Sequence, residues 1–201
     1  MHISEGVLAT PVLAGGAALT AAGLGVALKK LNNEDIPKVG VLSAGFFVAG
    51  LIHVPMGVAS VHLVLNGLVG LILGWLSFPA IFVGLLLQSI MFQYGGITAL
   101  GVNTFNMAVP ALISYFLFAR LATKTSKSYV SSVSAFMAGS LAIFLSGILV
   151  GISLYLTGEA FLPAAKIVVA GHIPVMLIEG IITAACVTFL KKVKPELLSR
   201  T

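Results

Sequence analysis

The first two residues of the chain could chelate a transition-metal cation. The amine of Met1, the amide nitrogen of His2 and the imidazole of His2 can close two fused chelate rings on one ion. This arrangement supplies three nitrogens in a plane, and Ni²⁺ and Cu²⁺ favour square-planar or tetragonal nitrogen sites. A fourth nitrogen would come from elsewhere in the chain, and another histidine is the natural donor. Any chain that begins with Met-His has these groups, so an incidental second residue is the competing interpretation.

Two histidines in the next part of the chain could donate the fourth nitrogen. His53 lies in LIHVP and His62 in VPMGVASVHLVLNG. Either one could instead be an interfacial histidine with no ligand role. Ser60 and Asn66 flank His62 and could orient its ring, and Asn66 could alternatively satisfy backbone groups.

A second polar cluster is QYGGITALGVNTFNM, residues 93–107. Its two glycines predict a folded or re-entrant loop between apolar stretches. Asn103 and Asn106 would then be candidates for the wall of a metal pocket, although a solvated loop explains the same residues.

His172 and Glu179 form a third candidate pair. They are seven residues apart in GHIPVMLIEG, so a helix places them on one face. An ionisable group inside a membrane span must be paired, protonated or directed into a cavity. A structural hydrogen bond to another helix and a role in the path of an ion are both consistent with this pattern.

The elements that position these residues must be membrane helices. Hydrophobic residues make up 59% of the 201-residue chain and charged residues 8%, and the mean hydropathy is +1.12. A soluble domain carries roughly a quarter charged residues, so lipid must be the solvent of this chain. We expect an all-α integral membrane protein with one transmembrane domain over residues 1–201.

Apolar stretches and loop charges predict seven spans and their orientation. The stretches are roughly 6–28, 39–54, 59–75, 78–94, 106–121, 129–157 and 166–190. With seven spans, the basic segments 29–38, 120–128 and 191–200 fall on one side and hold ten of the eleven Lys and Arg residues. The positive-inside rule then predicts an external N-terminus and a cytoplasmic C-terminus. The first charge is Glu5, so no positive signal-peptide region precedes the first apolar run, and we expect the N-terminus to be retained.

Common catalytic motifs are absent from the sequence. The chain has no GxxxxGK[ST] phosphate loop, no HExxH and no GxSxG, and its one cysteine, Cys186, cannot form an internal disulfide. We therefore expect a protein that is not an enzyme and that needs no cofactor.

Four segments carry a family resemblance when taken together in order: MHISEG, ASVHLVLNGLVG, GVNTFNMAVPA and GHIPVMLIEGIITA. They resemble the CbiM/NikM family, the membrane substrate-capture (S) components of cobalt and nickel transporters of the energy-coupling-factor type. The resemblance runs essentially the whole length of the chain.

The resemblance implies a ligand set and an assembly. Ni²⁺ or Co²⁺ would be bound by the Met1 amine, the His2 amide and imidazole, and His62, with the N-terminus inserted toward the core of the bundle. Leu-Val-Leu after His62, in place of Pro-Thr-Gly, favours nickel.

The implied partners are a small accessory membrane protein, a transmembrane coupling protein and cytoplasmic ATPases, in the inner cell membrane. Ala14, Ala18 and Ala22, spaced at i, i+4 and i+8, would suit close docking on the coupling protein. The competing hypothesis is a stand-alone secondary cation transporter or channel. In that case His172 and Glu179 would relay protons and Met1 would have no role.

Overall fold

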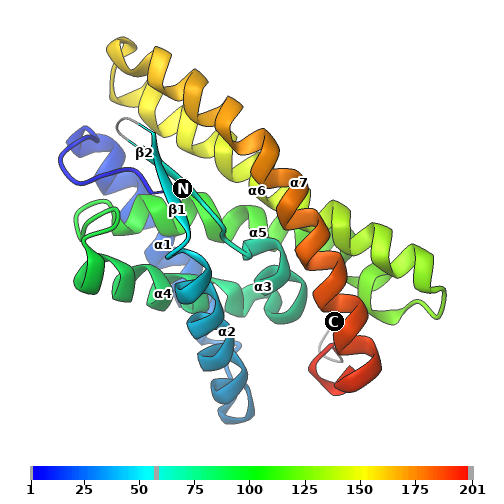
Figure 1. Ribbon diagram of the computed structural model, residues 1–201. Helices are drawn as coiled ribbons and strands as arrows, with labels where there is room; N and C mark the ends of the chain where they lie inside the picture. The colour runs from blue at the N-terminus through cyan, green and yellow to red at the C-terminus, as the bar shows by residue number, and fades with distance from the viewer. Residues whose placement is uncertain (1, 57–58, 199–201) are drawn as a thin grey trace.

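The computed structural model describes residues 2–56 and 59–198, and within these it leaves out the side chains of residues 53–56 and 59–61. The described chain folds into α-helices joined by short 3-10 turns and one β-hairpin (Figure 1). The helices are α1 (Thr10–Leu28), α2 (Ile36–Ala49), α3 (Asn66–Leu73), α4 (Ser77–Phe92), α5 (Leu100–Lys124), α6 (Ser128–Thr157) and α7 (Leu162–Val193). The strands are β1 (His53–Met56) and β2 (Ala59–His62), and the 3-10 turns are η1 (Asn33–Asp35), η2 (Gly74–Leu76), η3 (Glu159–Phe161) and η4 (Pro195–Leu198).

Five helical stretches of the described chain are long and apolar enough to cross a membrane. They are Thr10–Leu28, Asn66–Phe92, Leu100–Lys124, Ser128–Thr157 and Glu159–Val193. Large apolar side chains such as Ile173, Leu177 and Ile181 are exposed on α7, as a helix facing lipid requires. The prediction of a helical, multi-pass membrane protein is therefore confirmed, whereas the count of seven spans is not.

The expected span 59–75 is wrong in its first half. Strands β1 and β2 form an antiparallel hairpin in which His53 pairs with His62 and Val54 with Val61, and the helix begins only at Asn66. β-branched valines favour the extended backbone. The stretch 39–54 likewise becomes helix only as far as Ala49, because the chain then turns into β1.

Short elements are tolerated here because they lie inside the protein. Every residue of α3 is buried, and its eight residues cover only about 12 Å at 1.5 Å per residue. At Gly74 the backbone takes a positive φ of 55°, which breaks the helical path between α3 and α4. Non-helical backbone at membrane depth is stable only when protein or a cavity surrounds it.

Glycines allow the buried helices to approach closely. An alanine methyl at Gly67 would lie 2.6 Å from the Cα of Gly139 on α6, and one at Gly70 would collide with the carbonyl of Ala111 on α5. Helices α6 and α7 form a long antiparallel pair, and α5 packs against α6 as well as against α1, α3 and α4 (Figure 1). Small residues therefore pack α3 inside the bundle, as lipid-embedded helices commonly require.

Candidate metal centre

Two histidines that are 60 positions apart in the sequence meet inside the protein. The rings of His2 and His62 stack with their centroids 4.4 Å apart and their planes inclined by 20°. Each residue is only 3% exposed. The ring of Tyr94 lies beside them, with its centroid 6.2 Å from that of His2. The fold thus brings together two of the three predicted ligand residues. The third, Met1, lies outside the described residues.

The hydrogen bonding of His62 leaves one nitrogen available for a ligand role. Nδ1 lies 2.7 Å from the carbonyl oxygen of Leu63, so Nδ1 carries the proton and donates it to that oxygen. In a neutral imidazole the other nitrogen, Nε2, then has a free lone pair. This Nε2 is buried and has no hydrogen-bond partner within the described chain. A neutral imidazole with one nitrogen fixed by a carbonyl is the usual form of a metal-ligating histidine.

Burial also favours the neutral state of His62, which lies in the hairpin outside the helical spans. Loss of solvation lowers the pKa of this imidazole well below its usual range, and repulsion from His2 and His172 lowers it further. A metal competes with protons for imidazole nitrogen, so this shift leaves the nitrogen open to a metal at neutral pH.

A buried carboxamide holds the N-terminal segment in place. Asn103 Oδ1 accepts a hydrogen bond from the backbone N–H of Ile3 at 2.9 Å, and its Nδ2 donates to the Ile3 carbonyl at 3.1 Å. The Asn103 amide therefore pairs with the Ile3 backbone as a neighbouring β-strand would, and so fixes the residue that follows His2. Ile3 itself is fully buried in an apolar cluster with Val102 and Val150.

The loop between α4 and α5 covers this segment. Gly95 and Gly96 have positive φ angles of 77° and 81°. An alanine methyl at Gly95 would lie 2.8 Å from Asn103 Nδ2 and 3.3 Å from His2 Cβ, and one at Gly96 would collide with Glu5. The loop backbone thus closes directly over His2. The Gly-Gly pair was the sequence signal for a folded loop, and its role as part of the wall of a metal pocket stays a prediction.

The predicted loop 93–107 is wrong in its second half, since α5 begins at Leu100. Asn103 and Asn106 are helical and buried because each finds a partner inside the bundle: Asn103 binds Ile3, and Asn106 Nδ2 donates to Ser153 Oγ at 3.1 Å. Polar side chains are stable in a buried helix when their hydrogen bonds are satisfied. Asn103 lies beside the histidines, whereas the described contact of Asn106 ties α5 to α6.

The side-chain amide of Asn66 donates its hydrogen bonds to α5 and α6, and no described contact of Asn66 orients His62. Its Nδ2 donates to the Met107 carbonyl and to Ser146 Oγ, both at 3.0 Å. Of the other candidates, the side chains of His53 and Ser60 lie outside those the structure describes.

His172 and Glu179 are both buried on α7, and in the described contacts each has its own partners. The Glu179 carboxylate accepts hydrogen bonds from the backbone N–H groups of Val64 and Leu65, and so anchors the chain between the hairpin and α3. His172 Nδ1 donates to the Val168 carbonyl at 2.6 Å. His172 is also close enough to His62 to influence its charge.

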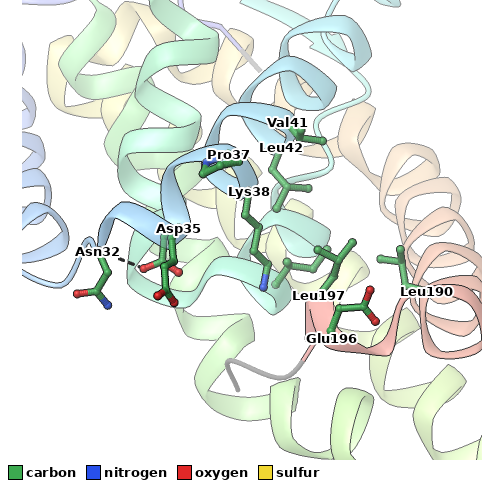
Figure 2. Close-up of a pocket in the computed structure, with 11 residues that line it drawn as sticks. Asn32, Asp35, Pro37, Lys38, Val41, Leu42, Leu190, Glu196 and Leu197 are labelled. Atoms are coloured by element: carbon green, nitrogen blue, oxygen red, sulfur yellow. Dashed lines mark hydrogen bonds between the residues drawn. The ribbon is translucent and has the colours of Figure 1, made fainter.

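A large cavity lies elsewhere, at the opposite end of α2 from the hairpin. It measures about 740 Å³ and is lined by residues of η1, α2 and the C-terminal turn, including Asp35, Lys38 and Glu196 (Figure 2). Its floor is apolar, with Leu42 and Leu190. No histidine side chain that the structure describes lines it, so His2 and His62 and this cavity are separate features.

Known proteins resemble this chain over nearly its full length. Residues 2–197 match the family model described as "Cobalt uptake substrate-specific transmembrane region". A Haemophilus influenzae protein named for metal transport is 43% identical over 202 residues, which cover 100% of this chain and 98% of that protein. A cobalt transport protein CbiM of Sorangium cellulosum is 28% identical and covers 100% of this chain and 95% of its own length.

A solved structure shares the fold. A crystal structure titled as that of a transition metal transporter superposes with a TM-score of 0.76 at 27% identity, covering 96% of this chain and 93% of that one.

Proposed function

Because this chain belongs to the family of cobalt uptake substrate-specific transmembrane regions, we propose that it captures Ni²⁺, or alternatively Co²⁺, with high affinity for uptake into the cell. The observation that carries this proposal is the buried, stacked pair of His2 and His62. The two rings come from distant parts of the sequence, and nitrogen ligands suit both ions.

The proposed ligands are the Met1 amine, the His2 amide nitrogen and imidazole, and His62 Nε2. Three features support the set: the fixed tautomer of His62, the hold of Asn103 on Ile3 and the burial of both rings. A preorganised, water-poor site favours metal binding because its ligands need little rearrangement. The His2 amide must lose its proton on binding, so capture weakens as the pH falls.

The orientation of the chain in the membrane is inferred from the contacts between loops at each end of the bundle. The N-terminal segment, β2 and the loop at Gly95 lie together, and Ala9 N–H donates to Thr157 Oγ1 at the end of α6. At the other end, Lys191 donates to the Thr125 carbonyl. These contacts support seven crossing segments. The count adds α2 to the five long helical stretches and divides the stretch Asn66–Phe92 into two segments, α3 and α4. In this topology the histidines face outside and the basic segments face the cytoplasm.

The chain acts in this proposal as the substrate-binding component of an ATP-driven energy-coupling-factor transporter in the inner cell membrane. Its partners are a small accessory membrane protein, a transmembrane coupling protein and cytoplasmic ATPases. Ala14, Ala18 and Ala22 are exposed along α1, where small residues would let a partner helix approach closely. No cofactor is needed, since the metal is the cargo.

Equilibrium binding of Ni²⁺ to the purified chain tests the ligand set. We expect His2→Ala to weaken binding by at least about 100-fold, since it removes one ligand and disturbs a second. An N-terminal tag should have a similar effect because it removes the free amine, whereas the same tag at the C-terminus should not. Wild-type affinity in the His2→Ala protein or in the N-terminally tagged protein would refute the ligand set.

Uptake measurements test the assembly. Cells with the partner proteins should accumulate nickel, and vesicles that contain this chain alone should not. Nickel uptake by such vesicles under a proton gradient would favour the stand-alone transporter.

A further inference from the structure

Three buried hydrogen-bond acceptors lie at the end of β2, at the start of α3 and on α7. They are His62 Nε2, Asn66 Oδ1 and His172 Nε2, and none has a hydrogen-bond partner among the described residues. The three residues are 3%, 0% and 2% exposed, respectively. Buried polar atoms without partners are uncommon in native proteins, so three together require an explanation.

The other contacts of these residues define all three atoms as acceptors. The Nδ1 protons of His62 and His172 are donated to the carbonyls of Leu63 and Val168, which leaves a lone pair on each Nε2. The Nδ2 of Asn66 donates to two oxygens, so its Oδ1 is the acceptor end of the amide. The cluster therefore offers three acceptors and no donor.

Contacts through α6 place the three residues near one another. Asn66 binds Ser146, and the next residue, Gly147, lies beneath the ring of His172: an alanine methyl there would be 3.4 Å from His172 Cβ and Cγ. Asn66 begins α3 four residues after His62, and strand β2, which ends at His62, packs against α7, the helix that carries His172.

The chemistry of the cluster suits a metal cation. Imidazole nitrogens and an amide oxygen are ligands for divalent transition metals. A single water has two protons to donate and would leave one of the three acceptors unsatisfied. Ionisable residues inside a transporter commonly mark the path of an ion.

We propose that His62 Nε2, Asn66 Oδ1 and His172 Nε2 form an inner cation position that receives the metal from the capture site during release. This inference rests on the proposed function. His62 belongs to both positions, so the ion can exchange its Met1 and His2 ligands for Asn66 and His172 without leaving protein ligands. His172 lies ten residues into α7, roughly 15 Å along the helix axis from its start, which places the inner position within the span.

Two substitutions at one residue test the role of the His172 lone pair. His172→Asn keeps a donor near the place of Nδ1 and loses the acceptor at Nε2, whereas His172→Gln places an amide oxygen near Nε2. We expect His172→Asn to bind Ni²⁺ within about twofold of wild type and to lose at least about tenfold in uptake rate in cells with the partner proteins. His172→Gln should recover most of that rate.

Two outcomes would overturn the inner position. One is a wild-type uptake rate in His172→Asn. The other is a loss of Ni²⁺ affinity in His172→Asn as large as in His62→Ala, because His172 would then belong to the capture site itself.

A second measurement does not depend on the folding of the His172 variants. The His2→Ala protein lacks the capture site but keeps all three inner ligands, so it should retain a weak Co²⁺ site with its own visible absorption. That absorption should disappear when His62→Ala is added, and no Co²⁺ absorption in the single variant would refute the inner position. The proposed function fails separately, if the wild-type chain itself binds neither Ni²⁺ nor Co²⁺.

Discussion

At the scale of single residues, a buried side-chain amide fixes the segment that carries a proposed metal ligand. The described chain forms no helix from His2 to Ala9, so this segment needs a hold from another element. Asn103 supplies that hold through two hydrogen bonds to Ile3 across 100 residues of sequence. His62 obtains a comparable constraint from the Leu63 carbonyl, which fixes its tautomer.

The hold of Asn103 on Ile3 predicts a loss of metal affinity when it is removed. Asn103→Leu keeps the side-chain volume but leaves the Ile3 N–H and carbonyl buried without partners, at a cost of about 1–3 kcal/mol for each group. We expect Ni²⁺ affinity to fall about 10–100-fold, measured by equilibrium titration of the purified chain.

Asn106→Leu is the matched control, one turn further along α5. It removes the bond to Ser153, so it should lower stability with little effect on affinity. Equal affinities in wild type and Asn103→Leu would contradict the positioning role of Asn103.

At the scale of elements, the hairpin and α3 depend on an anchor from another helix. Leu65 has a positive φ of 59° and precedes α3 without a side-chain cap of its own. The Glu179 carboxylate on α7 accepts the N–H groups of Val64 and Leu65 in place of a local cap.

Removal of the Glu179 anchor should destabilise the bundle. Glu179→Leu leaves two buried N–H groups unsatisfied, and we expect a loss of about 2–6 kcal/mol in unfolding free energy, counting about 1–3 kcal/mol for each. Thermal unfolding in detergent measures the change. Glu196→Leu on the exposed turn η4 is the control, since its ion pair with Lys194 at 3.5 Å is solvent-exposed and contributes little. An unchanged unfolding temperature in Glu179→Leu would show that the anchor is dispensable.

At the scale of the whole molecule, the loops gather at two ends. The end with the histidines collects the N-terminal segment, the hairpin and the loop over Gly95, whereas the end with the 740 Å³ cavity collects η1 and the C-terminal turn. The candidate metal ligands His2 and His62 and the 740 Å³ cavity therefore lie at opposite ends of the described bundle.

Cysteine labelling in intact cells checks the orientation of these two ends. In a Cys186→Ala background, Ile97→Cys on the loop beside Gly96 should react with a membrane-impermeant maleimide, because Ile97 is 63% exposed. Asn33→Cys, exposed in η1, should react only after the cells are permeabilised. The reverse pattern would place the histidine end in the cytoplasm.

The amino-acid sequence by itself determined the membrane character, the helical class and the gathering of basic charge into three segments. Hydropathy and charge add up along the chain whatever the fold is, so they can be read locally. The chelating potential of Met1 and His2 was visible for the same reason, since the two residues are adjacent. The family resemblance, carried by four ordered segments, selected His62 from the remaining histidines.

Only the tertiary structure decided what surrounds these groups. Residues 53–54 and 59–62 were predicted to belong to membrane spans but lie in the strands of a hairpin, because strand pairing satisfies backbone groups that lipid could not. Asn103 was predicted to lie in a loop, but it is buried in α5. Its amide is satisfied there by Ile3, which is 100 residues away in the sequence and so could not be identified locally. The stacking of His2 on His62 likewise depends on long-range packing, which no local pattern in the sequence encodes.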